Sequence, residues 1–382
     1  SLLEAKENVT ITYSGLETAT NIYLYQDEAL LPLEESLTTD KQVDGTWNIG
    51  QVLEPGRYKV RAEKEDGEGV DSIRLTVKDI PFASEPYTMM LVSDIHVLHP
   101  DLLVKEGKAF DNAVSSDRKM MAESARAFDA LIDTILLYKP QLVLVSGDLT
   151  KDGERLGHEY VADGLHRLMD AGISSLVIPG NHDVNNPYAA SYNGDEKQHV
   201  EEVNDSEFAA IYKDFGYDEQ KVIRDTVSLS YMAEPTQGLC VLGIDATQWY
   251  LNKHKDTDGA DSRYDTGRLL PSTLQWILDR ADEAKASNKR VIVMMHYEII
   301  EHFNNATSML SSAILADADT IAPLLMEHGI HVVMTGHVHI SDIAVGYNTQ
   351  MTDSIIDITT GSTITYPAHF RWLQLTDGFS RM

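Results

Sequence analysis

The first eighty residues alternate between apolar and polar positions in short segments. Alternation of this kind, rich in β-branched and aromatic side chains, is found in residues 9–13, 21–25, 58–62 and 73–77. Turn sequences such as Pro55-Gly56 separate the segments. Short alternating segments divided by turns predict strands, so we expect residues 1–80 to form a small all-β, immunoglobulin-like sandwich domain. Residues 81–86 contain two prolines and are predicted to be a linker, because proline interrupts both helices and strand ladders.

From residue 87 onward, short and continuous apolar runs alternate with amphipathic segments. The runs are residues 89–92, 142–145, 176–178, 239–242, 291–295 and 332–334. Runs this short predict strands that are buried on both faces. Between the first two runs, apolar residues from Met121 to Ile135 recur at three- or four-residue steps, which predicts a helix ending before Lys139-Pro140. Residues 272–286 predict a second helix, and the alternation as a whole predicts an α/β layered domain over residues 87–382.

Side chains able to bind metal follow five of the predicted strands. In chain order they are Asp94 and His96, Asp148, Asn181, His296, and His337 with His339. In α/β sheets, sites form just beyond the carboxyl ends of the strands, so we expect these side chains to meet at one edge. Two carboxylates, one amide oxygen and four imidazoles make an all-nitrogen-and-oxygen set, which suits Mn, Fe, Zn or Ni. Glycines precede Asp148, Asn181 and His337, where they allow sharp turns and close backbone approach.

The order of these motifs resembles that of calcineurin-like metallophosphoesterases. The order is Asp-x-His, Gly-Asp, Gly-Asn-His-Asp, a strand-end His and Gly-His-x-His, and the resemblance covers residues 87–375. It implies a four-layer αββα fold with a dimetal centre. By this resemblance, one metal is held by Asp94, His96, Asp148 and His339. The second is held by Asp148 as a bridge and by Asn181, His296 and His337.

The same resemblance assigns roles to two residues that are not ligands. His182 is expected to face the substrate as a proton donor or phosphate contact. Asp183 is expected to orient His182 by accepting a hydrogen bond from its other ring nitrogen. The implied reaction is hydrolysis of a phosphoester by metal-activated hydroxide, with His182 protonating the leaving oxygen.

Three positions distinguish this chain from other branches of the family. Asp152 and Pro179 stand where phosphoprotein phosphatases carry arginines, so protein dephosphorylation is disfavoured. Lys151 stands where purple acid phosphatases carry an iron-binding tyrosine, so a ferric–tyrosinate centre is not expected. We therefore expect a small phosphorylated substrate and favour a phosphodiester. A phosphomonoesterase or nucleotidase of the same fold is the alternative.

The substrate pocket is expected to be built by three polar insertions, residues 97–118, 184–206 and 246–268. Four aromatic residues in the last two could stack on a base or sugar, although ordinary loop packing is the favoured interpretation: Tyr188, Tyr192, Trp249 and Tyr250. His99 and Asp245 lie near strand ends, and structural roles are favoured for both. For His254 and His302 the sequence suggests no partner.

Composition limits the partners and the location. The chain has 382 residues, with 60 acidic and 31 basic side chains and a net charge of −29, so stable binding to nucleic acid is disfavoured, as is a nuclease of this fold. No apolar run has the length of about 20 residues that a membrane helix needs. A single cysteine, Cys240, lies within an apolar run and is interpreted as buried and inert.

The β-domain, the acidity and the absence of disulfides favour an exported or cell-surface protein of a bacterium, whose signal peptide would have preceded Ser1. A cytoplasmic location is the alternative, and the oligomeric state is left open. The rival to an enzyme is a surface-binding protein that uses the domain as a scaffold. The complete set of ligand-type residues argues against that rival.

Overall fold

The computed structural model describes residues 86–115, 118–303, 306, 310 and 312–375, together with the strands between residues 2 and 78. The chain divides into two compact units. One comprises Ser1–Pro86 with Leu375–Met382, and the other comprises Tyr87–Gln374. Residues 81–85 of the predicted linker, 81–86, lie outside the described residues.

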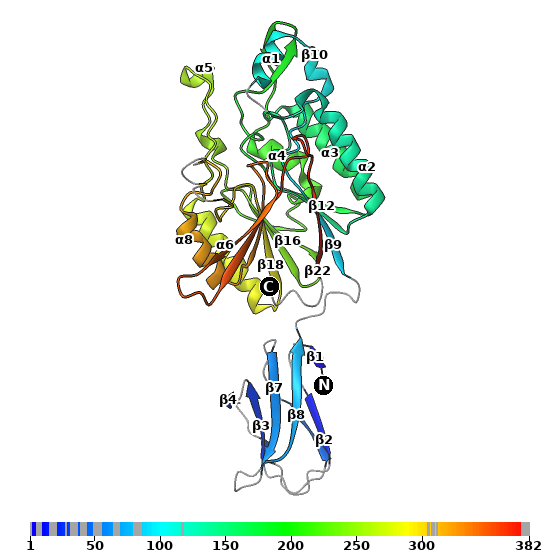
Figure 1. The fold of residues 1–382 in the computed structure, drawn as a ribbon, viewed down its shortest axis with the longest axis vertical. Helices are drawn as coiled ribbons and strands as arrows, with labels where there is room; N and C mark the ends of the chain where they lie inside the picture. The colour runs from blue at the N-terminus through cyan, green and yellow to red at the C-terminus, as the bar shows by residue number, and fades with distance from the viewer. Residues whose placement is uncertain are drawn as a thin grey trace. The chain divides into compact units, whose positions relative to one another are not determined.

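The described part of the first unit consists of strands (Figure 1). One six-stranded sheet contains β1 (Leu2–Glu4), β3 (Asn21–Gln26), β4 (Ala29–Leu30), β5 (Leu37–Thr38), β7 (Gly56–Glu63) and β8 (Gly69–Lys78). A second sheet pairs β2 (Thr10–Ser14) with β6 (Asp44–Asn48) in antiparallel register. In β7, Tyr58 and Val60 are buried while Lys59 and Arg61 are partly exposed, which matches the predicted alternation. That the two sheets form an immunoglobulin-like sandwich stays a prediction.

The smaller sheet of the second unit joins four strands in the order β12-β11-β9-β22. Their bounds are Ser174–Val177 for β12, Leu142–Val145 for β11, Tyr87–Val92 for β9 and Arg371–Leu375 for β22. Strands β9, β11 and β12 run parallel, with Leu142 opposite Met89 on one side and Ser174 on the other. All four residues of β11 are buried, as its continuous apolar sequence predicts.

The larger sheet has seven strands in the order β15-β16-β17-β18-β19-β21-β20. Their bounds are Ile223–Arg224, Tyr231–Thr236, Leu239–Ile244, Arg290–Met295, Val332–Thr335, Ser354–Thr359 and Asp342–Tyr347. The four strands from β17 to β21 in this order are parallel, whereas β15, β16 and β20 pair antiparallel at the edges. The carboxyl ends of the parallel strands therefore share one edge.

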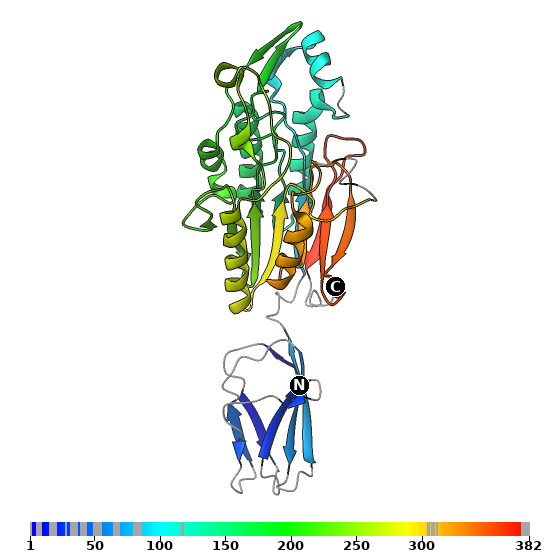
Figure 2. The ribbon, with the colours of Figure 1, turned by 90° about the vertical axis from the view of Figure 1, so that its left-hand side faces the viewer.

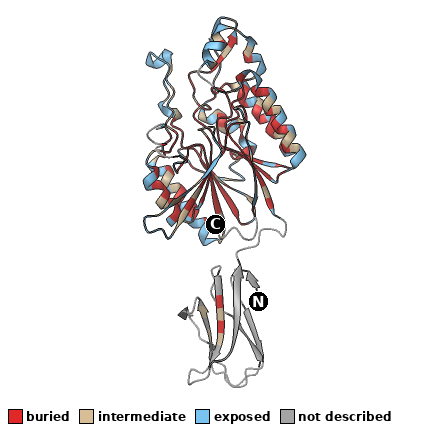
Figure 3. Ribbon diagram, in the orientation of Figure 1, coloured by how far each residue is buried: buried red, intermediate tan, exposed pale blue. Residues whose placement is uncertain are grey.

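Helices cover the outer faces of the two sheets (Figures 1 and 2). The helices α2 (Ser124–Tyr138) and α3 (Arg155–Asp170) lie beside the smaller sheet. On the larger sheet, α6 (Pro271–Ala286) and α8 (Ala318–Glu327) share one buried core with β17, β18 and β19. Burial is concentrated on the strands and on one side of each long helix (Figure 3). These layers confirm the predicted α/β metallophosphoesterase class of fold, with sheets between helices.

The predicted insertions form short elements of their own. From the first come η1 (Pro100–Leu102), β10 (Leu103–Lys105) and α1 (Lys108–Val114), and from the second come β13 (Ala190–Asn193) and β14 (Glu196–His199). β10 pairs parallel with β13, and β13 antiparallel with β14, so two insertions build one small sheet. Other helices with described bounds are η2 (Met121–Glu123), α4 (Asp205–Ile211), η3 (Lys213–Phe215), η4 (Trp249–Leu251) and α5 (Lys255–Asp258). Across the described ranges we find no helix with the length and apolar character to cross a bilayer.

Candidate metal centre

The seven predicted ligands meet beyond the carboxyl ends of five strands. β9 leads to Asp94 and His96, β11 to Asp148, β12 to Asn181, β18 to His296, and β19 to His337 and His339. Two groups of their ligand atoms, Asp94 with His96 and His339, and Asp148 with His296 and His337, each lie within 4.8 Å of one another. The structure thus brings all seven residues together, while their role as ligands stays a prediction.

The first group surrounds one carboxylate oxygen of Asp94. The Oδ1 atom lies 3.2 Å from His339 Nε2 and 3.8 Å from His96 Nε2, and these two ring nitrogens are 3.3 Å apart. The other oxygen, Oδ2, accepts hydrogen bonds from the Ser93 hydroxyl at 2.6 Å and from the His337 backbone at 3.0 Å. One oxygen is therefore anchored to the protein, and the other is turned toward imidazole nitrogens.

The second group consists of Asp148, His296 and His337, and Asn181 lies beside it. The nitrogen Nε2 of His296 is 3.2 Å from Asn181 Oδ1 and 3.2 Å from His337 Nδ1. Asp148 Oδ2 is 3.4 Å from His96 Nε2 and 3.5 Å from His296 Nε2, so it lies between the two groups. Asp148 Oδ1 is anchored by the backbone N–H of His182 at 3.0 Å. This position suits a carboxylate that bridges two cations.

The predicted ligands fit cations because their nitrogen and oxygen lone pairs face one another, and there are too few N–H and O–H groups nearby to bind them all. The ring nitrogen Nδ1 of His296 contacts the carbonyl oxygen of Ser146 at 2.8 Å, which assigns a proton to Nδ1 and turns Nε2 toward the other predicted ligands. His339 is similarly held from behind, through Nδ1, by the hydroxyl of Thr365 at 3.1 Å. Asp94 Oδ1 is buried and has no hydrogen-bond partner among the described residues. A buried acceptor of this kind is costly unless a cation or donor satisfies it.

Burial and neighbouring charges favour the metal-binding forms of His337 and Asp148. For His296, burial lowers the pKa, but Asp148 and Asp94 outweigh it and raise the pKa to about 9, so a bound cation would have to replace the proton on Nε2. Burial, reinforced by the positive charge of His296, lowers the pKa of His337 to about 3, so its imidazole is neutral near pH 7. Burial opposes ionisation of Asp148, but the surrounding imidazoles, His296 first, hold the pKa of its carboxyl well below the usual range. A neutral imidazole and an ionised carboxylate are the ligand forms.

The backbone is strained at most of the predicted ligands. Positive φ angles between 40° and 70° occur at Asp94, His96, Asp148, His337 and His339. Residues other than glycine rarely adopt such angles, and the cost of order 1–3 kcal/mol for each is typical of functional sites. The backbone conformation of the turns after these strands is therefore not the one that these residue types prefer, which is typical of a functional site.

The glycines that precede three ligands are required by close approach. A Cβ atom on Gly180 would lie 2.2 Å from Asp148 Oδ1 and 2.4 Å from the Asp148 backbone nitrogen. A Cβ atom on Gly147 would lie 2.7 Å from His296 Nδ1, and one on Gly336 would lie 1.8 Å from the Ser93 hydroxyl. These close contacts explain why a glycine stands directly before three of the predicted ligands in the sequence.

His182 lies beside the ligands. Its Nε2 atom is 4.0 Å from Asp148 Oδ2, and its ring stands edge-on to that of His96 with 4.7 Å between centroids. Its Nδ1 atom contacts the carbonyl oxygen of Lys151 at 2.5 Å and Asp152 Oδ1 at 3.1 Å. Arg263 Nη1 also lies 2.9 Å from Nδ1, but the two acceptors at this nitrogen favour a proton on Nδ1, so Arg263 lies beside it without donating and Nε2 faces the predicted ligands. Burial and the charge of Arg263 lower the pKa of His182.

The prediction that His182 donates a hydrogen bond to Asp183 is wrong. The Asp183 carboxylate points away and accepts from the backbone N–H groups of Leu149, Thr150 and Gly180 and from the Thr150 hydroxyl. It therefore fixes the loops that carry Asp148 and Asn181. Asp152, together with the Lys151 carbonyl, occupies the orienting position expected for Asp183. Adjacent residues in a turn point in different directions, so the role that the resemblance implied for Asp183 does not hold in this structure.

Sequence reasoning also missed two residues of the third insertion. Asp265 Oδ1 accepts from Asn181 Nδ2 at 2.8 Å, which turns the amide oxygen of Asn181 toward His296. Arg263 donates to Asp265 at 2.6 Å, and its Nη1 lies 3.2 Å from Asp152 Oδ1 and 2.9 Å from His182 Nδ1. The only signal in the sequence was that both lie in an insertion expected to contribute to the pocket.

Other singled-out residues are structural. Asp245 is buried and accepts from Leu229, Thr247 and Trp249, and His99 caps η1 through the backbone N–H of Asp101. Two histidines for which no partner was suggested have carboxylates nearby. His302 Nδ1 is 3.1 Å from Asp342 Oδ2, and His254 Nδ1 is 3.6 Å from Glu202 Oε1. The rings of Trp249 and Tyr250 pack edge-on, as expected for loop packing.

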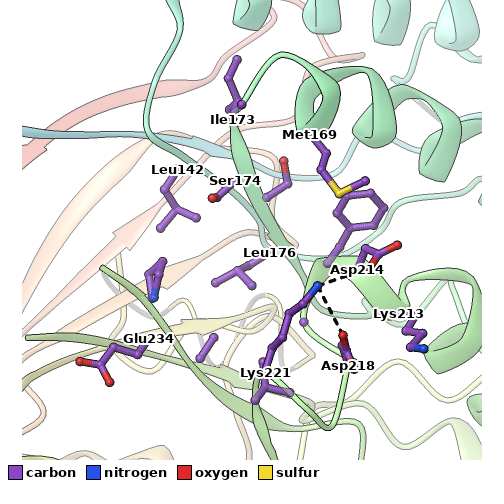
Figure 4. Close-up of a pocket in the computed structure, with 17 residues that line it drawn as sticks. Leu142, Met169, Ile173, Ser174, Leu176, Lys213, Asp214, Asp218, Lys221 and Glu234 are labelled. Carbon is purple, nitrogen blue, oxygen red and sulfur yellow. Dashed lines mark ion pairs between the residues drawn. The ribbon is translucent and has the colours of Figure 1, made fainter. Parts of the chain in front are cut away.

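A cavity of about 400 Å³ opens beside His182. Its wall includes Tyr188, Tyr192, Asp152 and four basic side chains, so the predicted loops do contribute to it. A different cavity, of about 360 Å³, lies at the amino ends of β11 and β12, opposite the predicted ligands. Figure 4 shows that Lys221 in this second cavity is paired with Asp214 and Asp218. Only the first cavity borders a predicted site residue.

Comparison with known proteins identifies the domain. A family model described as calcineurin-like phosphoesterase matches residues 87–341. No curated protein matches the chain. Among solved structures, a dimetal phosphatase from Danio rerio has a TM-score of 0.49 at 12% identity, covering 77% of this chain and 94% of that one. The purple acid phosphatase PPD1 of yellow lupin (Lupinus luteus) has a TM-score of 0.42 at 12% identity, covering 96% and 64%. PhoD has a TM-score of 0.40 at 15% identity, covering 94% and 75%.

Proposed function

This chain belongs to the calcineurin-like phosphoesterase family, and from that premise we propose that it hydrolyses a small phosphodiester at a dimetal centre. The proposal rests on one observation above all. Seven metal-binding side chains meet at the ends of five strands, with Asp148 between two groups of them and Asp94 Oδ1 without a hydrogen-bond partner in the described part of the chain.

The residues of the first group would hold one metal, and those of the second group the other, with Asp148 shared. Bound metals in such a pair activate water and bind phosphate oxygens, and Mn, Fe or Zn suits these ligands. Two divalent ions would contribute +4 against −2 from Asp94 and Asp148. The site would thus attract an anionic phosphoryl group despite the net charge of −29.

In this proposal His182 protonates the leaving oxygen. Its Nδ1–H is held by the Lys151 carbonyl and by Asp152, so the ring keeps its orientation while Nε2 remains available. Burial and Arg263 lower the pKa of the imidazolium, which makes it a stronger acid when it is protonated. Proton donation of this type contributes typically 10²- to 10⁴-fold to the rate.

The preference for a diester rests on the departures from the other branches. Asp152 and Pro179 replace the arginines of phosphoprotein phosphatases, and Lys151 replaces the tyrosine of purple acid phosphatases. In this structure Asp152 instead binds Lys151 and Arg263. A cavity of about 400 Å³ suits a small substrate rather than a protein chain. An exported location in a bacterium belongs to the same proposal.

Elemental analysis combined with two synthetic substrates tests the function. We expect two metal ions per chain and faster hydrolysis of bis-p-nitrophenyl phosphate than of mono-p-nitrophenyl phosphate. Faster hydrolysis of the monoester would favour a phosphomonoesterase. Two bound metals without hydrolysis of either compound would favour the surface-binding scaffold.

A further inference from the structure

The guanidinium group of Arg263 joins two carboxylates, those of Asp152 and Asp265. Its Nε atom donates to Asp265 Oδ1 at 2.6 Å, and its Nη1 atom donates to Asp152 Oδ1 at 3.2 Å. Asp152 follows the turn that carries Asp148, whereas Asp265 lies in the third insertion, residues 246–268. A guanidinium can hold two acceptors at once because its N–H groups point in fixed directions within one plane. Arg263 therefore ties the turn after β11 to the insertion.

The same two carboxylate oxygens also hold the adjacent residues Asn181 and His182. Asp265 Oδ1 accepts from Asn181 Nδ2 at 2.8 Å, and Asp152 Oδ1 lies 3.1 Å from His182 Nδ1, the ring nitrogen to which a proton is assigned. Asn181 is a predicted ligand of the second metal, and His182 is the proposed proton donor. Arg263 is thus one contact away from both functions.

The two carboxylates depend on Arg263 to different degrees. Asp152 is buried, and its other oxygen is paired with Lys151, which is a second anchor. The side chain of Asp265 is 46% exposed, and its hydrogen bonds among the described residues are those with Arg263 and Asn181. Water competes for an exposed carboxylate, so the charge-assisted bond from Arg263 is the stronger of the two that keep Asp265 in place.

The backbone of the insertion is held by other bonds on both sides of Arg263. Asn252 Oδ1 accepts from the backbone N–H of Tyr264 at 2.8 Å, and Gln248 Nε2 donates to the carbonyl oxygen of Thr266 at 2.8 Å. Replacing the side chain of Arg263 is therefore expected to leave the insertion in place while it frees the two carboxylates. An effect on the site can then be separated from unfolding.

We propose that Arg263 is a positioning residue that sets the proton donor and the second metal site together, by holding Asp152 against His182 and Asp265 against Asn181. The inference rests on the proposed function, because it takes His182 as the proton donor and Asn181 as a ligand. Arg263 does not donate to the His182 ring, so its influence passes through the two carboxylates. A displacement of about 1 Å in a group of this kind can cost on the order of a hundredfold in rate.

Metal affinity gives the first test and needs no turnover. Zn²⁺ is competed away from the wild-type protein and from Arg263→Ala with a chelator of known affinity. We expect the more weakly bound ion to be held about tenfold less tightly in Arg263→Ala, as is typical when the residue that orients a ligand is lost. Arg268→Ala is the matched control, because Arg268 lies in the same insertion but pairs with Asp317, and it should leave the affinity unchanged.

Turnover at saturating Zn²⁺ gives the second test. With both metal sites filled, Arg263→Ala should lower kcat by about fivefold or more for diesters with alkoxide leaving groups and by clearly less for bis-p-nitrophenyl phosphate, because only the former need a proton from His182. The loss is smaller than that expected for removal of His182, since Lys151 still anchors Asp152. KM should change by less than about twofold, which distinguishes positioning from direct binding of the substrate by Arg263.

Two further variants show whether Arg263 acts through the carboxylates. Adding Asp265→Ala to Arg263→Ala should weaken metal binding no further, because the same chain of contacts is already broken. Arg263→Lys keeps the charge but offers a single nitrogen, so it should not restore both metal affinity and kcat. This variant also keeps the inference testable if Arg263→Ala does not fold.

Three results would overturn the inference. The first is wild-type metal affinity and kcat in Arg263→Lys. The second is an equal loss of kcat on both types of ester at saturating Zn²⁺, and the third is additive losses of metal affinity in the double variant. If the wild-type protein binds two metals but hydrolyses neither ester, the proposed function fails instead. The chelator competition then still decides whether Arg263 and Asp265 hold Asn181.

Discussion

At the scale of single residues, Asp148 occupies the central position of the site. One of its oxygens lies within 3.5 Å of a ring nitrogen in each ligand group, and the other is held by the His182 backbone. The seven predicted ligands follow from their positions after apolar runs. The orientation of Asp183 does not, because consecutive side chains in a turn point in directions that sequence spacing does not encode. Asp152 and Asp265 act from other segments and become visible only in three dimensions.

Asp148→Asn tests the bridge. The substitution removes one negative charge from between two cations while keeping the size of the side chain, so both metals should bind more weakly. We expect substoichiometric metal by elemental analysis and a loss of turnover on the order of a hundredfold or more. Two metals per chain with a near-normal rate would show that Asp148 is not the bridging ligand.

His182→Asn separates proton donation from metal binding. Metal content should stay at two per chain, since the ring lies beside the ligands without being assigned as one. Turnover should fall by about 10²- to 10⁴-fold for esters of poor alkoxide leaving groups and much less for p-nitrophenyl esters, whose leaving group needs no proton.

A plot of rate against leaving-group pKa measures this difference. Equal losses for both types of ester would replace the proton-donor role by phosphate binding. Loss of a metal would make His182 a ligand.

Asp265→Ala tests how Asn181 is positioned. Without the acceptor at 2.8 Å, the Asn181 amide is free to rotate its oxygen away from His296. We expect one of the two metals to bind about tenfold more weakly in a chelator competition, which is within the range for residues that hold a ligand.

The conservative variant and a nearby aspartate serve as comparisons for this prediction. Asp265→Asn keeps an acceptor oxygen and should restore part of the affinity. Asp256→Ala, an exposed change in the same insertion, should have no effect. Unchanged affinity in Asp265→Ala would mean that Asn181 is held without Asp265.

At the scale of elements, the strand order explains why the ligands meet. Residues from Asp94 to His339 are far apart in the chain, but β9, β11 and β12 are parallel neighbours, as are β17, β18, β19 and β21. Short apolar runs predict such strands because burial on both faces leaves no polar alternation. The pairing of β10 with β13 could not be predicted in the same way. Both strands are short and lie in polar insertions, so neither has an apolar pattern that fixes a partner.

Gly180→Ala tests the fit between two strand ends. A Cβ atom 2.2 Å from Asp148 Oδ1 requires the loop after β12 to move away from the loop after β11. We expect a loss of stability of about 1–3 kcal/mol in denaturant unfolding, together with weaker metal binding.

The matched control for this prediction is Gly172→Ala. Gly172 has a φ of 79° but no atom within 4 Å of an added Cβ, so it should lose stability without losing metal affinity. Normal metal binding in Gly180→Ala would show that the two loops can separate without disturbing the ligands.

At the scale of the whole molecule, the two units divide the chemistry unequally. All seven predicted ligands, His182 and the cavity beside it belong to the unit Tyr87–Gln374. The apolar core formed by β17–β19, α6 and α8 also lies entirely within that unit. The change from alternating segments to continuous apolar runs near residue 87 predicts this division from sequence alone. The domain limits of 1–80 and 87–382 stay predictions.

A truncated chain of residues 87–375 tests whether the second unit functions without the first. It keeps β22, which lies beside β9 in the smaller sheet and would leave an open edge if it were removed. Because a unit with its own core can fold alone, we expect a soluble protein with two metals per chain and a rate on bis-p-nitrophenyl phosphate close to that of the full chain. Urea unfolding should then give one cooperative transition. If the truncated chain is insoluble, or folds but loses metal, residues 1–86 are needed to complete the catalytic unit, and the sequence change near residue 87 does not mark the boundary of an independent domain.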